Sequence, residues 1–589
     1  MQKLKLTSWS LVAVMLLAAG LAFNTKAGAQ ASEPQSVSPT ATSAPSPKID
    51  EVKALKDQLA LQQKQIDQLQ NALEEQKQLL QTIQMKQSGA TVQAASVSRP
   101  NAASDQSSQS PNLGQVASLT PVIPAAVPVT APAPSPNPLH PPAEEASPLQ
   151  FHIGDAYVTP VGFMDFTSVW RSHDGGSGIG TNFGSIPYGA VFQNNLSEFR
   201  LSMQNSRVGF RVDALVKGAH VIGYMESDFL GNNGGNVAVS SNSNTLRSRL
   251  YWVDVQKSNW EVLGGQTWSL ITPGRSGISP LPSNLFYSQD IDVNYQAGLV
   301  WGRIPELRVV YHPSNKAAFA IALDSPEQYV GGSGGGGTVV FPSALSSAYS
   351  SELNTGGTTL AVPNVAPDVI AKLAVDPSSR FHFEVGGLER NFKVWNPTTT
   401  TDFSAAGGGG FLNLNVELAK GFRLLTNNFV SDGGGRYIFG EAPDLIAKAD
   451  GSISLIHADS TVSGFEFTQK NSLIYAYYGG IYIGRNVAIV STSTTSGTPP
   501  VTTTKLTPVG YGFAGSASGQ NRAIQEATFG FNQTLWKDAK YGALNFMGQY
   551  SYLTRNPWSV ATGQPLNASI NMVFFNLRYT LPGSAPTLK

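Results

Sequence analysis

Arginine and acidic side chains recur on three neighbouring segments of this sequence, and their types and spacing favour the binding of anions. Within each segment they alternate with apolar residues, so they share one face of an extended chain. Guanidinium groups pair bidentately with carboxylates, and a row of them facing water concentrates anions. The candidate residues for this chemistry are Arg200, Arg207, Arg211, Arg247, Arg249, Glu226 and Asp228.

The two acids admit a second interpretation. Glu226 and Asp228 could neutralise the arginines in a structural network, or they could anchor some arginines and leave others free. The sequence favours none of these interpretations over the others.

Signals for catalysis or metal binding are weak. The seven histidines are scattered, and none has the spacing of metal ligands on a helix. Residues 331–335 match the pattern GxSxG, but they lie in a glycine run without a strand–turn–helix context. The chain has no cysteine, which excludes thiolate metal sites and disulfides. We therefore expect no enzyme, no catalytic residue, no metal and no cofactor.

The segment 196–214 carries the first arginines and predicts a strand with a β-bulge. Its apolar residues alternate with polar ones, but the phase slips by one residue near Asn205 and Ser206. A bulge at that point returns Arg207 and Arg211 to the face of Arg200.

Between residues 151 and 580 the alternation repeats and predicts sixteen strands. They cover 157–170, 197–215, 219–229, 246–256, 260–268, 296–311, 317–323, 369–376, 380–392, 410–419, 421–430, 462–469, 472–484, 525–535, 541–553 and 569–580. A second bulge is expected at Pro305.

The connections between these strands alternate strictly between tight turns and long loops. The eight long ones are 171–196, 230–245, 269–295, 324–368, 393–409, 431–461, 485–524 and 554–568. An even strand number with this alternation is typical of an antiparallel transmembrane β-barrel with long extracellular loops. A soluble β-sandwich also alternates, but a content of 13% charged residues and aromatic residues near strand ends favour the barrel.

Charged side chains on a barrel strand would cost several kcal/mol if they faced lipid, so the arginines must line the lumen. The third long connection, 269–295, is the candidate for a loop that folds inward and constricts the pore. Its Asp290 and Asp292 would then face the arginine row and create a transverse field. The alternative is an ordinary exposed loop.

The region before the barrel has a different character. Residues 1–29 have a positive head, an apolar run and a small-residue cleavage site, as in a secretory signal peptide. Residues 30–48 are expected to be disordered, and 85–150 form a linker rich in Pro, Ala and Ser. Between them, residues 49–84 show five heptads that predict an α-helical coiled coil of undetermined oligomer number. Residues 581–589 form a short C-terminal tail.

The segment Gly265-Gln266-Thr267-Trp268-Ser269 resembles the GQTWS strand of the DcaP-like outer-membrane porins. The stretch SRVGFRV at 206–212, the strand end around Asp228-Phe229 and the order of signal, coiled coil, linker and barrel are also similar to that family. The resemblance implies a trimeric sixteen-stranded porin for small anionic solutes, including dicarboxylates, with its helices in the periplasm. Unlike the family pattern, the chain continues past Tyr579 through LPGSAPTLK.

We therefore expect a porin of the bacterial outer membrane that lets small hydrophilic, anionic solutes diffuse passively through an arginine-lined lumen. Its partners would be lipid and lipopolysaccharide and two further copies of the chain. The zero net charge and the absence of a basic tract argue against nucleic acid. The alternative is a trimeric surface-anchored binding or adhesion protein, with 324–368 and 485–524 as its binding surface and the barrel as its anchor.

Overall fold

A computed structural model describes residues 148–583 of this protein, apart from 232–241, 243, 286–288, 334, 357–361 and 497–500. The expected signal peptide and coiled coil lie outside the described residues, as does nearly all of the linker, and these stay predictions. No helix in the described ranges is both long and apolar enough to cross a membrane.

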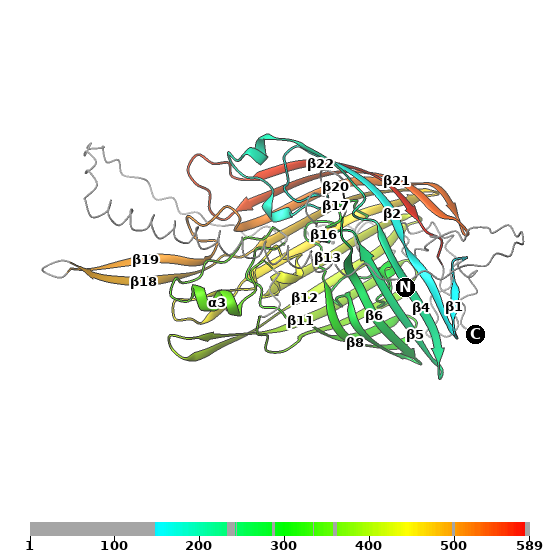
Figure 1. Cartoon of the computed structure of the whole chain (residues 1–589), viewed down its shortest axis with the longest axis horizontal. Coiled ribbons are helices and arrows are strands. Elements are labelled where there is room, and N and C mark those ends of the chain that lie inside the picture. The colour runs from blue at the N-terminus through cyan, green and yellow to red at the C-terminus, as the bar shows by residue number, and fades with distance from the viewer. Residues whose placement is uncertain are drawn as a thin grey trace, which may run out of the picture. The chain divides into compact units, whose positions relative to one another are not determined.

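The described chain forms a closed antiparallel barrel, in which the first wall strand pairs with the last (Figure 1). β3 and β4 form one bulged strand, and the short β1 (Phe151–Ile153) is not counted as a wall strand. On this count the predicted number of sixteen wall strands is confirmed. The wall consists of β2 (Ala156–Arg171), β3 (Glu198–Ser202) with β4 (Arg207–Val216), β5 (Ala219–Asp228), β6 (Arg247–Lys257), β7 (Trp260–Trp268), β8 (Arg303–Ser314), β9 (Ala317–Asp324), β10 (Asp368–Ser378), β11 (Phe381–Asn396), β12 (Thr401–Ala419), β13 (Phe422–Asp432), β16 (His457–Gln469), β17 (Ser472–Ile483), β20 (Asn521–Asp538), β21 (Gly542–Pro557) and β22 (Ala568–Thr580).

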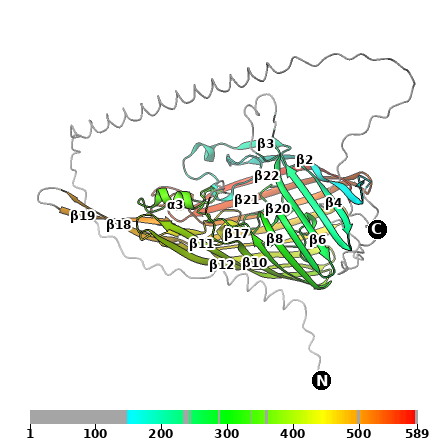
Figure 2. The same cartoon turned by 60° about the horizontal axis from the view of Figure 1, so that its bottom comes forward.

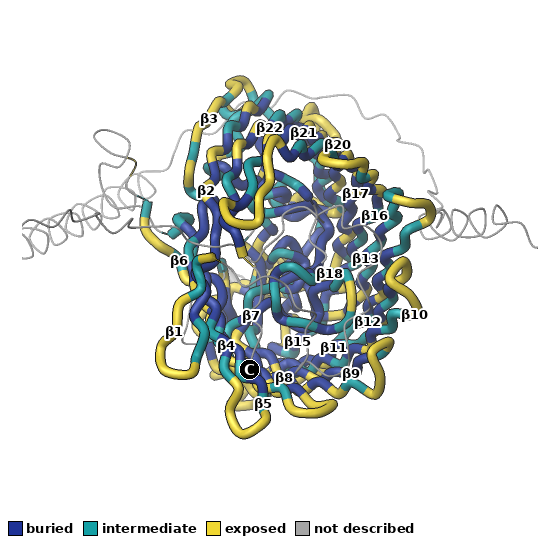
Figure 3. Tube along the Cα trace, turned by 90° about the vertical axis from the view of Figure 1, so that its right-hand side faces the viewer, coloured by how far each residue is buried: buried dark blue, intermediate teal, exposed yellow. Residues whose placement is uncertain are grey.

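The wall strands lie side by side with a common tilt (Figure 2), and their two faces differ as the alternation predicts. Apolar side chains such as Leu412 and Phe529 are exposed on the outer face. Polar side chains such as Asn413 and Asn532 point inward and are buried. A water-filled lumen would leave such side chains exposed, so their burial means that other parts of the chain fill much of the interior. Figure 3, which looks along the barrel, shows buried segments inside the ring of strands.

The predicted bulge at Asn205 and Ser206 is confirmed by the register. On β2, Thr167 pairs with Ser202 and Phe163 pairs with Arg207, so four residue steps on β2 match five on its neighbour. The extra residue keeps β3 and β4 in one wall strand.

Three expectations about the strands and their connections are wrong. The segment 296–302 is not a strand, because this apolar stretch is buried inside the barrel, and β8 begins only at Arg303. The register of β7 and β8 runs unbroken through Pro305, which therefore marks no bulge. The connection predicted at 393–409 is mostly strand, since β11 and β12 extend each other as a long hairpin that turns after Asn396.

The long connections carry short elements of their own, most of them at the end of the barrel opposite the tight turns (Figure 1). The hairpin of β18 and β19 projects beyond the barrel, and β14 pairs with β15. These elements are η1 (Phe183–Ser185), η2 (Phe192–Asn195), η3 (Pro282–Asn284), α3 (Ser346–Glu352), η4 (Gly435–Tyr437), β14 (Leu445–Ala447), β15 (Ile453–Leu455), β18 (Asn486–Ser496) and β19 (Val501–Tyr511).

Candidate pore constriction

The connection between β7 and β8 folds into the barrel and crosses its interior. We call residues 269–302 the constriction segment. Near its start, the N–H of Gly274 donates to Glu384 on β11 at 3.0 Å, and further on the N–H of Ile291 donates to Gln549 on β21 at 2.5 Å. Because β11 and β21 lie in different parts of the wall, the segment spans the lumen. The predicted inward fold of this connection is therefore confirmed.

Inward-facing polar side chains hold this segment by its backbone. Glu526 accepts a hydrogen bond from the N–H of Ala297 at 2.9 Å, and Asn427 accepts one from the N–H of Val300 at 3.4 Å. Buried backbone N–H groups need such acceptors, since unpaired ones destabilise the fold. The fit is tight at Gly479 on β17, where an added Cβ would lie 1.8 Å from the carbonyl oxygen of Ala297. The wall and the constriction segment are therefore closely packed and complementary in shape at this point.

The two acids of this segment do not contact the arginines in the expected way. Asp292 is buried and accepts hydrogen bonds from the N–H groups of Thr181 at 3.2 Å and Asn294 at 2.8 Å. Asp290 and Asp292 both lie close enough to Glu526 of β20 to repel its charge. Their negative charge therefore lies on the side of the lumen that β20 lines.

Four of the predicted residues form the centre of an ion-pair network on β5 and β6. Arg249 is buried and contacts Glu226 at 2.9 Å and Asp228 at 2.7 Å. Arg247 binds Asp228 through two nitrogens, at 3.1 and 2.8 Å. Arg207 on β4 reaches Glu226 at 3.4 Å. The sequence brings these residues together because β4, β5 and β6 are consecutive antiparallel strands.

A register shift in β6 lets both Arg249 and its neighbour Leu250 lie inside the barrel. Glu226 pairs with Leu250 and Ser227 pairs with Ser248, so Arg249 is the extra residue. The alternation predicted Leu250 and Trp252 on the face opposite the arginines, but both are buried in the interior. An unrecognised bulge is the physical reason for this error.

The remaining two predicted arginines lie apart from this network. Arg200 on β3 is about half exposed and pairs with Glu198 at 2.6 Å. Arg211 is buried and forms an ion pair with Asp213 at 2.7 Å. The ring of His220 contacts the same carboxylate at 3.1 Å. All five predicted arginines therefore have an acidic partner, and Glu226 and Asp228 are the partners of three of them.

The sequence analysis missed a further arginine, Arg303, at the start of β8. Its guanidinium carbon lies 5.3 Å from the ring centroid of Trp268 and 5.2 Å from that of Trp301. It lies close enough to Arg247 and Arg249 to feel their charge, yet it forms no ion pair with any residue that the structure describes. Nothing in the alternation singles it out, because its neighbours come from the constriction segment.

We call Arg207, Arg247, Arg249 and Arg303, with Glu226 and Asp228, the arginine cluster. It holds four guanidinium groups against two carboxylates, so it carries an excess of positive charge. The aromatic rings beside it pack on one another, with ring centroids of Trp268 and Trp301 5.5 Å apart. Aromatic faces attract a guanidinium and help to hold Arg303 where no carboxylate does.

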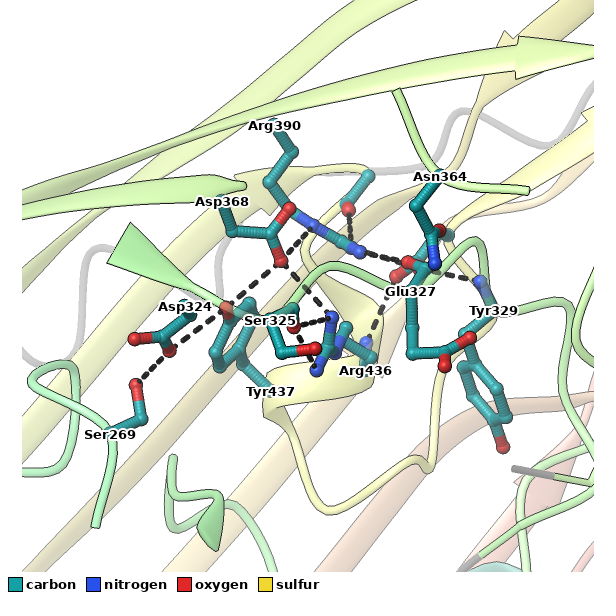
Figure 4. A network of polar contacts seen from close by, with 12 residues as sticks. Ser269, Asp324, Ser325, Glu327, Tyr329, Asn364, Asp368, Arg390, Arg436 and Tyr437 are labelled. Atoms are coloured by element: carbon teal, nitrogen blue, oxygen red, sulfur yellow. Dashed lines mark hydrogen bonds and ion pairs between the residues drawn. The ribbon is translucent and has the colours of Figure 1, made fainter. Parts of the chain in front are cut away.

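A second polar network fastens the long connections to the wall (Figure 4). Arg390 of β11 contacts Asp368 at 3.0 Å and Asp444 at 2.8 Å. From η4, Arg436 reaches Asp368 at 3.2 Å, and the hydroxyl of Tyr437 donates to the same carboxylate at 3.0 Å. We call these five residues, with Asp324, the loop-anchoring network. Through Asp324, which accepts a hydrogen bond from Ser269 at 2.6 Å, it extends to the start of the constriction segment.

Comparison with solved structures finds barrels of the same kind. The outer membrane channel DcaP of Acinetobacter baumannii matches with a TM-score of 0.50 and 15% sequence identity, over 73% of this chain and 99% of that chain. The barrel has the fold of this channel. The likeness to DcaP expected from the GQTWS strand is therefore confirmed at the level of the fold. An anion-selective porin from Comamonas acidovorans matches with a TM-score of 0.40 and 12% identity, over 72% of this chain and 99% of that chain. No protein-family model and no curated protein matches the sequence.

Proposed function

We propose that this protein is a porin of the bacterial outer membrane through which small hydrophilic solutes, preferably anions such as carboxylates, diffuse passively. The fold supports this proposal, since it is the fold of an outer-membrane channel. The constriction segment supports it further, because a segment that crosses the lumen limits the size of a passing solute. The exposed apolar outer face suits contact with lipid and lipopolysaccharide.

The observation that carries the preference for anions is the position of Arg303. The carboxylates of the arginine cluster already bind Arg207, Arg247 and Arg249. Arg303 has no such partner among the described residues, so its guanidinium is available to a passing carboxylate, which it can bind bidentately. Aromatic walls with a low dielectric strengthen its attraction for an anion.

The solvent exposure of the interior favours a route beside this cluster. Inward side chains of β20, β21 and β22 are buried, whereas Arg303 is partly exposed and 39% of the Arg247 side chain is exposed. Asn294 of the constriction segment is also partly exposed. We therefore place the solute path between the arginine cluster and the constriction segment, with Asp290 and Asp292 as the negative side of its field.

Three further features of the proposal rest on the sequence. The heptads at 49–84 would self-associate in the periplasm, and the family resemblance makes the assembly a homotrimer. The signal peptide would direct the chain to export.

Reversal potentials in planar bilayers under a salt gradient test the proposed function. Arg303→Ala should move the reversal potential toward zero, because it removes the one guanidinium of the arginine cluster that has no ion pair among the described residues. Arg380→Ala is the control, since Arg380 lies in a tight turn with 56% of its side chain exposed and its charge acts far from the path. On the sequence-based expectation, alanine at Arg200, Arg207, Arg247 and Arg249 also removes the preference for anions.

The outcomes separate the proposal from its alternative. An unchanged potential in Arg303→Ala would remove the proposed role of this residue. A wild-type protein that shows no conductance at all would instead favour the surface-anchored binding or adhesion protein, whose barrel serves only as an anchor.

A further inference from the structure

The carboxyl group of Glu441 is buried where three of the long connections pack against a fourth. It belongs to the connection between β13 and β16, and none of its surface is exposed. An added Cβ at Gly184 of η1 would lie 2.2 Å from its Oε2, so the first connection packs directly against it. At the start of β20, Asn521 donates to the carbonyl oxygen of Gly184 at 2.8 Å.

The surroundings of this carboxyl group compensate little of its charge. Neither of its oxygens has a hydrogen-bond partner of ordinary geometry in the described part of the chain, although the N–H groups of Phe183 and Gly184 face it. Arg555 of β21 is the cation that acts on it, but this guanidinium donates to the carbonyl oxygen of Ile186 at 2.8 Å and to Asn521 at 3.1 Å.

The other titratable groups around Glu441 are tyrosines, Tyr511 from the end of β19 and Tyr329 from the connection after β9. Burial raises the pKa of both hydroxyl groups above its ordinary value, so both stay neutral from acid to moderately alkaline pH. They therefore add no change of charge of their own in the range in which the carboxyl group of Glu441 titrates.

We propose that Glu441 makes the closure of the extracellular mouth depend on acid. Its carboxyl group is neutral while the three connections pack around it, and it ionises in water when they separate. Closure of the mouth therefore takes up a proton from solution, and opening releases one. This inference goes beyond passive diffusion, although its conductance test rests on the proposed channel function.

The sign of the pH dependence follows from the burial. Burial raises the pKa of the Glu441 carboxyl group well above its ordinary value while the connections are packed, and separation restores a value of about 4.3. Packing is therefore strongest at acid pH and weakens as the pH rises through the raised pKa. Between the two values, the ratio of open to closed protein rises about tenfold for each pH unit.

The variant Glu441→Gln tests this mechanism, because glutamine has the shape of the protonated side chain and cannot ionise. The matched control is Glu389→Gln, since Glu389 is exposed and hydrogen-bonds to Asn391 beside it. The first measurement is amide hydrogen exchange of residues 182–186 and 436–444 in detergent at pH 5 and pH 8. Dividing each wild-type rate by the Glu441→Gln rate at the same pH removes the intrinsic pH dependence of exchange.

We expect this ratio to be at least about tenfold larger at pH 8 than at pH 5. The ratio of wild type to Glu389→Gln should stay near one at both pH values. A ratio to Glu441→Gln that does not change with pH, or that falls as the pH rises, would overturn the proposal.

The second measurement is the fraction of time that single channels spend closed at the same pH values. Wild type and Glu389→Gln should close more at pH 5, whereas Glu441→Gln should stay equally closed at both. A pH-independent wild type would overturn the gating role. Exchange that behaves as expected in a protein without conductance would contradict the channel function but support the acid-dependent packing.

Discussion

The arginine cluster and the loop-anchoring network use the same side chain under different charge balances. In the loop-anchoring network, two arginines face three aspartates, and Arg390 is almost completely buried. In the arginine cluster, four arginines face two carboxylates, and Arg247 and Arg303 are partly exposed. The first arrangement fastens connections to the wall, whereas the second keeps positive charge available to solvent.

This difference shows that the function of an arginine in the barrel depends on its partners and its access to water. The charge of a buried arginine between two carboxylates is compensated, so this arginine is not available to bind a solute. An arginine held by aromatic faces retains its hydrogen-bond donors. Counting arginines on an inward face therefore does not measure the selectivity of the pore.

The largest expected effect is that of Arg390→Ala. It leaves Asp368 and Asp444 buried with less compensation, so we expect a loss of about 3–5 kcal/mol in the free energy of unfolding. Urea unfolding of the barrel in detergent measures this loss. Arg380→Ala should change the free energy by less than about 1 kcal/mol, because its contact with Glu417 is long, at 3.9 Å, and its own side chain is exposed. Equal effects of the two variants would contradict the distinction between anchoring and surface arginines.

Asp228→Asn should destabilise the barrel less than Arg390→Ala does, and it should strengthen the preference for anions. The amide oxygen can still accept hydrogen bonds from Arg247 and Arg249, but the NH2 group cannot accept from the Nε–H of Arg247, and the charge that compensates both arginines is lost. We expect a loss of about 1.5–3 kcal/mol in the free energy of unfolding. The reversal potential should move closer to the equilibrium potential of the anion. A weaker anion preference would show that the cluster is not part of the solute path.

Gly479→Ala tests whether the constriction segment holds the cluster in place. The new methyl group would collide with the backbone of Ala297, so the segment must move at a cost of about 1–3 kcal/mol. Single-channel conductance should change with it. Gly264→Ala is the matched control, because a Cβ at this wall glycine meets nothing within 4 Å. If both variants conduct like the wild type, the segment does not set the width of the path.

The smallest effect is expected from Arg200→Ala. Arg200 is about half exposed, and its partner Glu198 also binds Arg171 at 2.7 Å. Its removal should cost at most about 1 kcal/mol. The selectivity should change less than in Arg303→Ala. A larger change of the reversal potential than that of Arg303→Ala would place the selective site at the outer rim.

Local sequence was a good guide where the wall alone decides the structure. The alternation on β4 predicted the shared face of Arg207 and Arg211, and the phase slip at Asn205 and Ser206 predicted the bulge. The prediction from local sequence failed for residues 296–302, which have the apolar character of a strand but lie inside the barrel. Apolar residues report burial, and burial inside the lumen gives the same pattern as burial in a wall.

The sequence by itself determined the period of the strands, their number and which face carries charge, because these depend on neighbours one or two residues away. Only the tertiary structure decided which arginine of the arginine cluster lacks an acidic partner and which carboxyl group three other connections enclose. Arg303 and Glu441 owe their surroundings to segments far away in the chain. The balance of charge around a side chain is set by distances in space, which local periodicity does not encode.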